Sequence, residues 1–270
     1  SIRVDNRIKD INVGIDAHSI TDHTQGNWNG IVGKIILKTT PKIYFDDIQV
    51  YPDLSNKKAV VKMVLKSTSS TATPVHLKIN AQSFNSDKVH TLTPISHDYI
   101  MKKGILNCEM VLEMGNNMLT WDEFNPALYK LTAELTNGKK KEVKQIQFGI
   151  REFAIKGKWF YVNGRQTQLR GTVECCTFPL TGYPPTDVKS WERIFRICRS
   201  SGLNHIRFHS YCPPEAAFIA ADLVGIYLQP EGPAWPNHGV RLGNGAPIDK
   251  YLMDETIRLT REYGNYASYS

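Results

Sequence analysis

The chain has 270 residues, of which 41% are hydrophobic and 22% are charged, and its formal net charge is +7. This composition is typical of a globular protein of two or three domains and excludes a disordered or fibrous chain. No apolar run approaches the ~18 residues that a membrane-spanning helix needs, so we predict no membrane span. The first five residues resemble a strand and not a signal peptide.

The excess positive charge raises the question of nucleic acid. Its densest stretch is residues 137–142, Asn-Gly-Lys-Lys-Lys-Glu, which lies between two alternating apolar stretches. An Asn-Gly pair in this position predicts a hairpin turn, and the lysines there would protect a sheet edge. Since interleaved aromatic residues and a recognition helix are absent, we predict that nucleic acid is not a partner.

Residues 1 to about 150 are predicted to form β-strands and no helices. The segments rich in β-branched or alternating residues are 35–37, 59–65, 75–79, 131–135 and 143–148. Proline and glycine residues separate these segments at regular intervals. Strands at such spacing predict a β-sandwich, and residues 41–150 make one domain of immunoglobulin-like size.

After Gly149 the pattern changes to alternating strands and helices. Strands are predicted at residues 169–173, 205–209 and 226–229, and helices at 188–198, 214–223 and 248–263. The pair Thr186-Asp187 is placed to supply an N-cap and a first-turn acid for the first helix, and Gly202 and Gly225 to end the first and second helices. The order strand, helix, strand, helix, strand, helix predicts a parallel βα repeat.

Several ordered motifs carry a resemblance to a known family. Trp121, residues 125–129 (Asn-Pro-Ala-Leu-Tyr) and residues 148–151 (Phe-Gly-Ile-Arg) resemble glycoside hydrolase family 2, the β-galactosidase and β-glucuronidase group. The resemblance covers nearly the whole chain, with further motifs at residues 2–6, 28–33, 160–164, 169–171, 202–207, 221–225 and at Glu231.

The resemblance implies a multidomain β plus α/β fold. Residues 1–40 would be the C-terminal remnant of a jelly-roll sugar-binding domain, residues 41–150 an immunoglobulin-like β-sandwich, and residues 151–270 the N-terminal part of a TIM (β/α)8 barrel. A complete barrel of this kind needs about 250 residues, whereas 120 follow residue 150. We therefore expect three βα units and a fragment that lacks both ends of the parent protein.

The function that the resemblance implies is that of a retaining exo-glycosidase, which hydrolyses terminal glycosidic bonds. This chemistry needs two carboxylates about 5–5.5 Å apart, and the resemblance places both beyond residue 270. We therefore predict that the chain contains no catalytic residue and is itself inactive. Two alternatives stay open: a non-catalytic carbohydrate-binding or structural β-sandwich protein, and a small α/β hydrolase that uses Cys175, His209 and Glu231.

Arg207 and His209 are candidate substrate-binding residues because they close the second barrel strand, where side chains point into such sites. Arg207 matches an Asn-x-x-Arg motif whose arginine orders the catalytic carboxylates in the family. A structural pair with a carboxylate is its alternative. His209 departs by one place from the family pattern Arg-x-x-His-Tyr-Pro, so it either contacts a sugar hydroxyl or is a buried structural histidine.

The candidate substrate-binding residues also include Glu174, Cys175, Glu231 and Trp235. Glu174 and Cys175 follow the first barrel strand, where relatives carry Arg-His-Glu. Cys175 thus replaces a sugar-binding histidine, which puts the substrate in question, and packing at the barrel mouth is its alternative role. Glu231 would support the site by hydrogen bonding. Trp235 would either stack on a sugar face or cover the core.

Asn27 and Trp28 lie where jelly-roll residues of relatives reach into the active site. His205, His209 and Cys212 suggest zinc, but a fourth ligand and a familiar spacing are missing, so we predict no metal and no cofactor. The expected partner is a carbohydrate. A part-barrel exposes strand edges, which predicts either an intermolecular contact, in a homo-oligomer or a crystal, or a poorly ordered C-terminal region. The compartment is open, since a periplasmic or extracellular location would need a signal peptide upstream.

Overall fold

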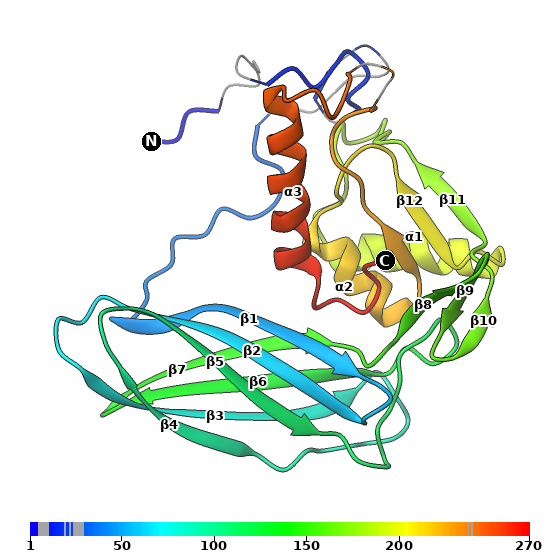
Figure 1. Cartoon of the computed structure of the whole chain (residues 1–270). Coiled ribbons are helices and arrows are strands. Elements are labelled where there is room, and N and C mark those ends of the chain that lie inside the picture. Colours follow the sequence, from blue (N-terminus) through cyan, green and yellow to red (C-terminus); the bar gives the residue numbers. More distant parts are fainter. Residues whose placement is uncertain (5–10, 19, 22, 24–29, 237, 239) are drawn as a thin grey trace. The chain divides into compact units, whose positions relative to one another are not determined.

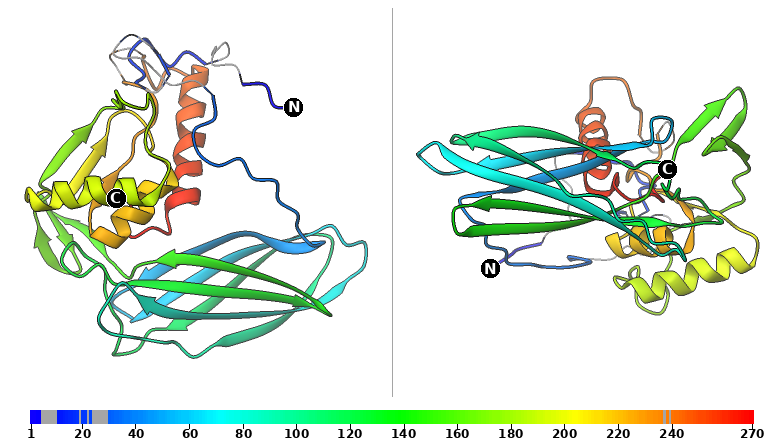
Figure 2. Two further views of the ribbon diagram at one scale, coloured as in Figure 1. Left: turned by 180° about the vertical axis from the view of Figure 1, so that it is seen from behind. Right: turned by 90° about the horizontal axis from the view of Figure 1, so that it is seen from below.

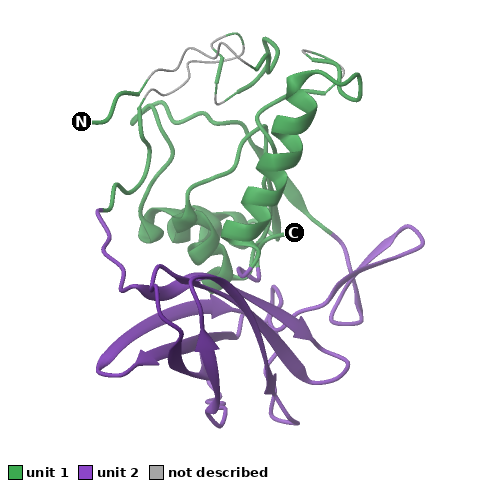
Figure 3. Ribbon diagram, turned by 60° about the vertical axis from the view of Figure 1, so that its left-hand side comes forward, with its two compact units in different colours: residues 1–36, 169–264, 268–270 green, residues 37–168, 265–267 purple. Residues whose placement is uncertain are grey.

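The computed structural model describes residues 1–4, 11–18, 20, 21, 23, 30–236, 238 and 240–270, drawn in colour in Figures 1 and 2. These residues form two compact units (Figure 3). Unit 1 contains residues 1–36, 169–264 and 268–270, and unit 2 contains residues 37–168 and 265–267. Each unit is described by itself below.

Unit 2 is a β-sandwich of two antiparallel sheets that lie face to face (Figure 1). The first sheet has the order β1-β2-β5, with β1 at Ile43–Asp53, β2 at Lys58–Ser67 and β5 at Gly104–Glu113. The second has the order β4-β3-β6-β7, with β4 at Ile95–Met101, β3 at Thr73–Phe84, β6 at Leu128–Asn137 and β7 at Lys140–Phe148.

The sandwich forms because its strands alternate between apolar and polar residues. In β2, Ala59, Val61, Met63 and Leu65 are at most 1% exposed, while Lys62 points to solvent. Side chains of a strand point alternately to its two faces, so one face of each sheet contributes to a shared core. Each fully buried aliphatic side chain contributes about 1.5–3 kcal/mol.

The predicted hairpin at residues 137–142 is confirmed. Asn137 of β6 pairs with Lys140 of β7, so the loop consists of Gly138 and Lys139. Gly138 has a φ of +56°, a conformation that glycine adopts without strain. β7 is an edge strand, as predicted.

The strand predicted at residues 35–37 is wrong. These three residues lie outside any strand, and Leu37 is 98% exposed. An apolar run becomes a strand only where a neighbouring strand can pair with it and bury one face. The described part of residues 1–40 contains no strand, including residues 1–4, and the jelly-roll assignment of this segment stays a prediction.

Close packing explains why the motif at residues 148 and 149 contains a glycine. A Cβ atom on Gly149 would lie 2.6 Å from the Cβ of Ala267 and 2.9 Å from the Cβ of Trp121, which is fully buried. The backbone N–H of Trp121 donates to the carbonyl of Ile150 at 2.8 Å. Only glycine therefore fits at position 149.

A small sheet of the order β10-β9-β8 completes unit 2, with β8 at Phe153–Lys156, β9 at Trp159–Val162 and β10 at Arg165–Thr167.

Unit 1 contains a parallel sheet of the order β11-β12-β13, with three helices. The strands are β11 (Gly171–Glu174), β12 (His205–Phe208) and β13 (Tyr227–Gln229), and the helices are α1 (Val188–Ser200), α2 (Glu215–Val224) and α3 (Pro247–Tyr263). α1 and α2 pack on each other and lie beside the strands (Figures 1 and 2). The predicted βα order is thus confirmed.

The helix ends follow the sequence signals. The Asp187 carboxylate accepts a hydrogen bond from the N–H of Ser190 at 2.9 Å and caps α1. Gly225 ends α2 in the left-handed region, with a φ of +84°. Among the described residues, no helix is long and apolar enough to cross a membrane.

The parallel sheet continues at the last residues of the chain. Tyr269 forms a parallel bridge with Leu228 of β13. The N–H of Leu228 donates to the carbonyl of Ser268 at 2.7 Å, and the N–H of Ser270 donates to the carbonyl of Leu228 at 2.9 Å. A fourth parallel segment therefore lies next to β13.

Candidate functional site

Charged side chains gather where the parallel strands end. Arg207 lies in β12, His209 follows β12, and Glu231 follows β13. The carboxyl ends of neighbouring parallel strands meet at one edge of a sheet, which is where ligands bind in open α/β folds. The N–H of Glu231 also donates to the carbonyl of Tyr211 at 3.1 Å and holds this loop in place.

Arg207 and Glu231 form an ion pair in which the Arg207 Nε donates to Glu231 Oε1. Arg207 is 40% exposed and Glu231 21% exposed, so the pair is open to a ligand from one side. Glu231 Oε2 lies 3.2 Å from the Nδ1 of His209. One carboxylate thus contacts both neighbours, and a charge-assisted contact of this kind fixes its orientation.

The Nδ1 of His209 has competing neighbours. Arg207 Nη2 lies 3.2 Å from it and can only donate, whereas the carboxylate of Glu231 can only accept. When Nδ1 carries the proton it donates to Glu231, and in the neutral ring Nε2 is then an acceptor. That tautomer offers Nε2 to a hydroxyl group of a ligand.

These residues line a cavity of about 580 Å³, within the range of ligand pockets. Trp235 and His238 line it as well, together with Leu252 and Thr256 of α3. The ring of His209 stacks on Trp235 with centroids 4.8 Å apart. The cavity therefore combines an ion pair, imidazole groups and an aromatic ring.

Glu174 lies at the end of β11, outside the set of described residues that line this cavity. The hydroxyl of Tyr211 donates to its Oε2, and the N–H of Thr177 donates to its Oε1 at 3.3 Å. Burial raises the pKa of Glu174 above its ordinary value, although the hydrogen bond from Tyr211 acts in the opposite direction. Its position therefore favours a structural contact with Tyr211.

Cys175 follows Glu174 and is partly buried. Burial raises the pKa of its thiol, and the negative charges of Glu174 and Glu231 add to this effect, while Arg207 opposes it. The thiolate is the nucleophilic form of cysteine, so these surroundings disfavour the hydrolase in which Cys175 attacks the substrate.

The sequence reasoning missed a group of histidines around Trp235. The ring of His18 lies 4.9 Å from that of His209 and 5.1 Å from that of Trp235. The carboxylate of Asp16 is 3% exposed and lies 2.7 Å from Nδ1 of His238, whose ring contacts Trp235. Burial would raise the pKa of Asp16, but hydrogen bonds with His238 and His23 hold it below its ordinary value.

No periodic signal marks residues 11–18, so the sequence could not have assigned His18 to this site. Tyr211 could have been found from the sequence, because it lies within residues 207–213, where the chain departs from the family pattern Arg-x-x-His-Tyr-Pro. Asn27 and Trp28 lie outside the residues that the structure describes. In the described part of the chain, no group of three or more His, Cys, Asp or Glu side chains is arranged to hold a metal ion.

A β-sandwich, a parallel βα repeat and a polar cluster at the strand ends define a multidomain protein with a cavity at the carboxyl edge of its parallel sheet, where ligands bind in α/β folds. The family model of glycosyl hydrolases family 2 matches residues 43–151 of the chain. The resemblance noted in the sequence is thereby confirmed.

The relatives extend this match along the chain. The chain is 32% identical to the β-galactosidase of Staphylococcus xylosus over 125 residues, or 46% of this chain and 12% of that enzyme. It is 22% identical to the β-galactosidase of Oenococcus oeni over 256 residues, or 92% of this chain and 25% of that enzyme. The chain therefore spans a quarter or less of these two relatives.

A solved structure shares the fold. The β-glucuronidase of Parabacteroides merdae matches 85% of this chain and 28% of its own, with a TM-score of 0.66 and 20% identity. Most of this chain therefore shares its fold with part of a β-glucuronidase structure.

Proposed function

We propose that the chain is part of a retaining exo-glycosidase that releases terminal sugars in the manner of β-galactosidases and β-glucuronidases. The family match and the names of the relatives support a glycosidase. The observation that carries the proposal is the cluster of Arg207, His209 and Glu231 at the carboxyl edge of the parallel sheet, next to Trp235.

In this proposal the domains keep the expected order. Residues 1–40 derive from a jelly-roll domain, residues 41–150 form the immunoglobulin-like sandwich, and residues 151–270 begin a TIM barrel. The parallel bridge between Leu228 and Tyr269 supports a sheet that continues beyond β13.

Each site residue has a role in binding and none in bond cleavage. Arg207 fixes the carboxylate of Glu231, and Glu231 accepts hydrogen bonds from sugar hydroxyls. His209 offers Nε2, and Trp235 presents a ring to the apolar face of a pyranose. Glu174 and Cys175 shape the adjoining wall, and Asn27 and Trp28 contribute from the jelly-roll segment.

The proposal also states that this chain does not hydrolyse glycosides by itself. Retaining hydrolysis needs a general acid and a separate nucleophile. Glu231 is engaged by Arg207 and His209, and Glu174 by Tyr211 and Thr177. Both carboxylates thus have internal partners that favour structural and binding roles.

A binding experiment tests the site. Saturation-transfer NMR with methyl β-galactoside and methyl β-glucuronide should detect binding to the wild-type chain. Glu231→Gln should weaken it by about tenfold, because a contact to a charged group contributes about 1.5–3 kcal/mol.

Glu113→Gln is the matched control, since it removes the same charge from an exposed position on β5. It should leave binding unchanged. Equal binding by Glu231→Gln and wild type, or no binding of either sugar by the folded chain, would contradict the proposed site.

A further inference from the structure

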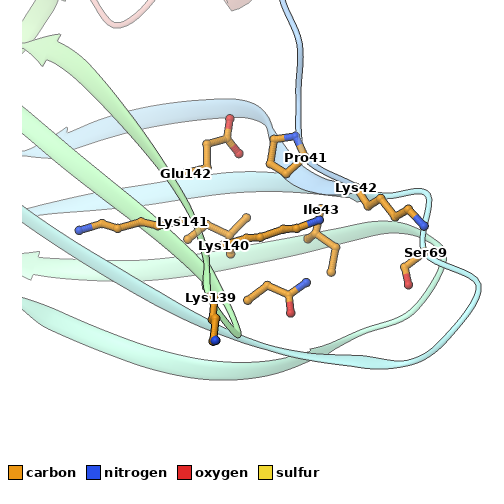
Figure 4. Close-up of a pocket in the computed structure, with 10 residues that line it drawn as sticks. Pro41, Lys42, Ile43, Ser69, Lys139, Lys140, Lys141 and Glu142 are labelled. Atoms are coloured by element: carbon orange, nitrogen blue, oxygen red, sulfur yellow. The ribbon is translucent and has the colours of Figure 1, made fainter.

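A second cavity lies in unit 2, at the end of the sandwich that contains the β6–β7 hairpin (Figure 4). Its volume is about 320 Å³, at the lower end of the range for ligand pockets. Strand β7 contributes Lys140, Lys141 and Glu142, and the segment before β1 contributes Pro41 and Lys42. Segments far apart in the sequence thus build one concave surface.

The charges around this cavity are unbalanced. Lys141 is paired with Glu134, with Nζ and Oε1 3.0 Å apart, and in Figure 4 its side chain runs away from Lys140. The carboxylate of Glu142 accepts a hydrogen bond from the N–H of Phe45 at 2.9 Å. The one acidic group in the lining is therefore already engaged by the backbone of β1.

Three lysines in the lining keep their charge uncompensated. Among the described residues, no carboxylate lies within 4.0 Å of the amino groups of Lys42, Lys139 and Lys140. Figure 4 shows Lys140 extended toward Ile43 and Lys42. Like charges placed around a concave surface raise the local concentration of anions.

Two further lysines of unit 2, Lys38 and Lys144, lie outside the described lining of the cavity. Burial lowers the pKa of Lys144, and the nearby amino group of Lys38 lowers it further, although Glu142 and Asp46 oppose this.

We propose that this cavity binds an anionic sugar residue of a glycan, one that carries a carboxylate or a sulfate group. Lys140, which extends toward Ile43, would contact the acidic group, and Lys42 and Lys139 would add positive potential around it. The polar side chains of Ser69 and Asn137 would contact hydroxyls, and Ile43 and Leu135 provide an apolar wall for the C–H face of the ring.

A glycan fits this cavity better than nucleic acid does. Proteins that bind single strands stack bases on aromatic rings, and the described lining has none. The volume suits a single sugar ring, and neutral hydrogen-bonding groups stand beside the lysines. The cavity lies in unit 2, whereas Arg207 and Glu231 lie in unit 1, so this inference does not rest on the sugar site proposed at Arg207 and Glu231.

Isothermal titration calorimetry tests the inference with tetragalacturonate, a sulfated carrageenan tetrasaccharide and neutral maltotetraose. One or both of the acidic ligands should bind, more weakly as salt rises, and maltotetraose should not. The stronger acidic ligand identifies the acidic group. The triple variant Lys42→Ala/Lys139→Ala/Lys140→Ala should lose at least about tenfold in affinity, because it removes the charge-assisted contact of Lys140 and the positive potential of Lys42 and Lys139.

The triple variant Lys78→Ala/Lys102→Ala/Lys103→Ala is the matched control, since it removes three exposed lysines of the same unit outside the cavity. It should bind within about twofold of wild type, as expected for distant, screened charges. Lys140→Glu repeats the test as a single change if the triple variant fails to fold. Equal losses in both triple variants, binding of maltotetraose, or tighter binding of a single-stranded oligonucleotide would overturn the inference.

Discussion

At the scale of single residues, close contacts explain several positions of the recognised motifs. Gly171 of β11 pairs with His205 of β12, and a Cβ atom on it would lie 2.6 Å from Nδ1 of His205. The glycine of the Leu-Arg-Gly motif is therefore needed so that the imidazole can pack across β11. A motif known by resemblance thus has a steric cause, which becomes visible only once strand register is known.

Glu174 gives a prediction about pH. Because burial raises its pKa in the folded chain above the ordinary value of 4.5, the folded state binds this proton more tightly than the unfolded state does. The contribution of Glu174 to the free energy of unfolding is therefore largest below pH 4.5. This contribution is lost as the pH rises through the pKa of the folded state. Glu174→Gln removes the charge and keeps one acceptor oxygen, for Tyr211, while its NH2 group replaces the oxygen that accepts from the N–H of Thr177.

We expect Glu174→Gln to be more favourable to the folded state at pH 7 than at pH 4, by on the order of 1 kcal/mol, because only at pH 7 does it remove a buried charge. Urea unfolding at both pH values measures the difference, with Glu113→Gln as the control. A stability change that is the same at both pH values would show that the buried charge of Glu174 does not destabilise the fold.

At the scale of elements, one buried carboxylate links α2 to the last segment of the parallel sheet. Asp222 is fully buried and its Oδ1 accepts a hydrogen bond from the N–H of Ser268 at 2.7 Å. Ser268 in turn holds Leu228 through its carbonyl. The motif at residues 221–225 thus positions the segment that pairs with β13.

Asp222→Ala should lower the free energy of unfolding by about 1–3 kcal/mol, because it leaves the Ser268 N–H buried without this acceptor. Hydrogen exchange should also accelerate at the amides of Leu228 and Ser270. Asp254→Ala, on an exposed part of α3, is the control. Unchanged exchange at Leu228 in the Asp222 variant would mean that Asp222 does not hold this segment.

Strong local signals predicted the elements with regular patterns. The pair Thr186-Asp187 and Gly225 marked helix ends, and β2 followed from its alternation. β1 was missed because a bulge between Phe45 and Asp47 shifts its register and interrupts the pattern. β4 was missed because most of its residues are polar or exposed, so only its pairing with β3 makes it a strand.

The candidate site was predicted in part because the order of strands and helices was predicted. Arg207, His209, Glu231 and Trp235 stand at strand ends or in the following loop, and the βα order places strand ends together. The contacts of His18 and Asp16 join residues more than 180 positions apart, and no local pattern encodes them. Tertiary packing alone brings these residues to the cavity.

At the scale of the whole molecule, the proposed role of this chain is to bind sugar without catalysis. The family match covers residues 43–151, and the chain spans 25% of the Oenococcus oeni β-galactosidase. The described site carries an ion pair, imidazoles and an indole, which can orient a sugar. The proposed roles assign no general acid and no nucleophile to this chain.

The most direct test of this central claim is the hydrolysis of 4-nitrophenyl β-galactoside and β-glucuronide by the purified 270-residue chain. Non-catalytic sugar binding predicts release of nitrophenol at the rate of the buffer alone, and an identical rate for Glu231→Gln. Turnover that follows the purified chain through successive columns and is lost in Glu231→Gln would contradict the account, because it would make Glu231 a catalytic residue.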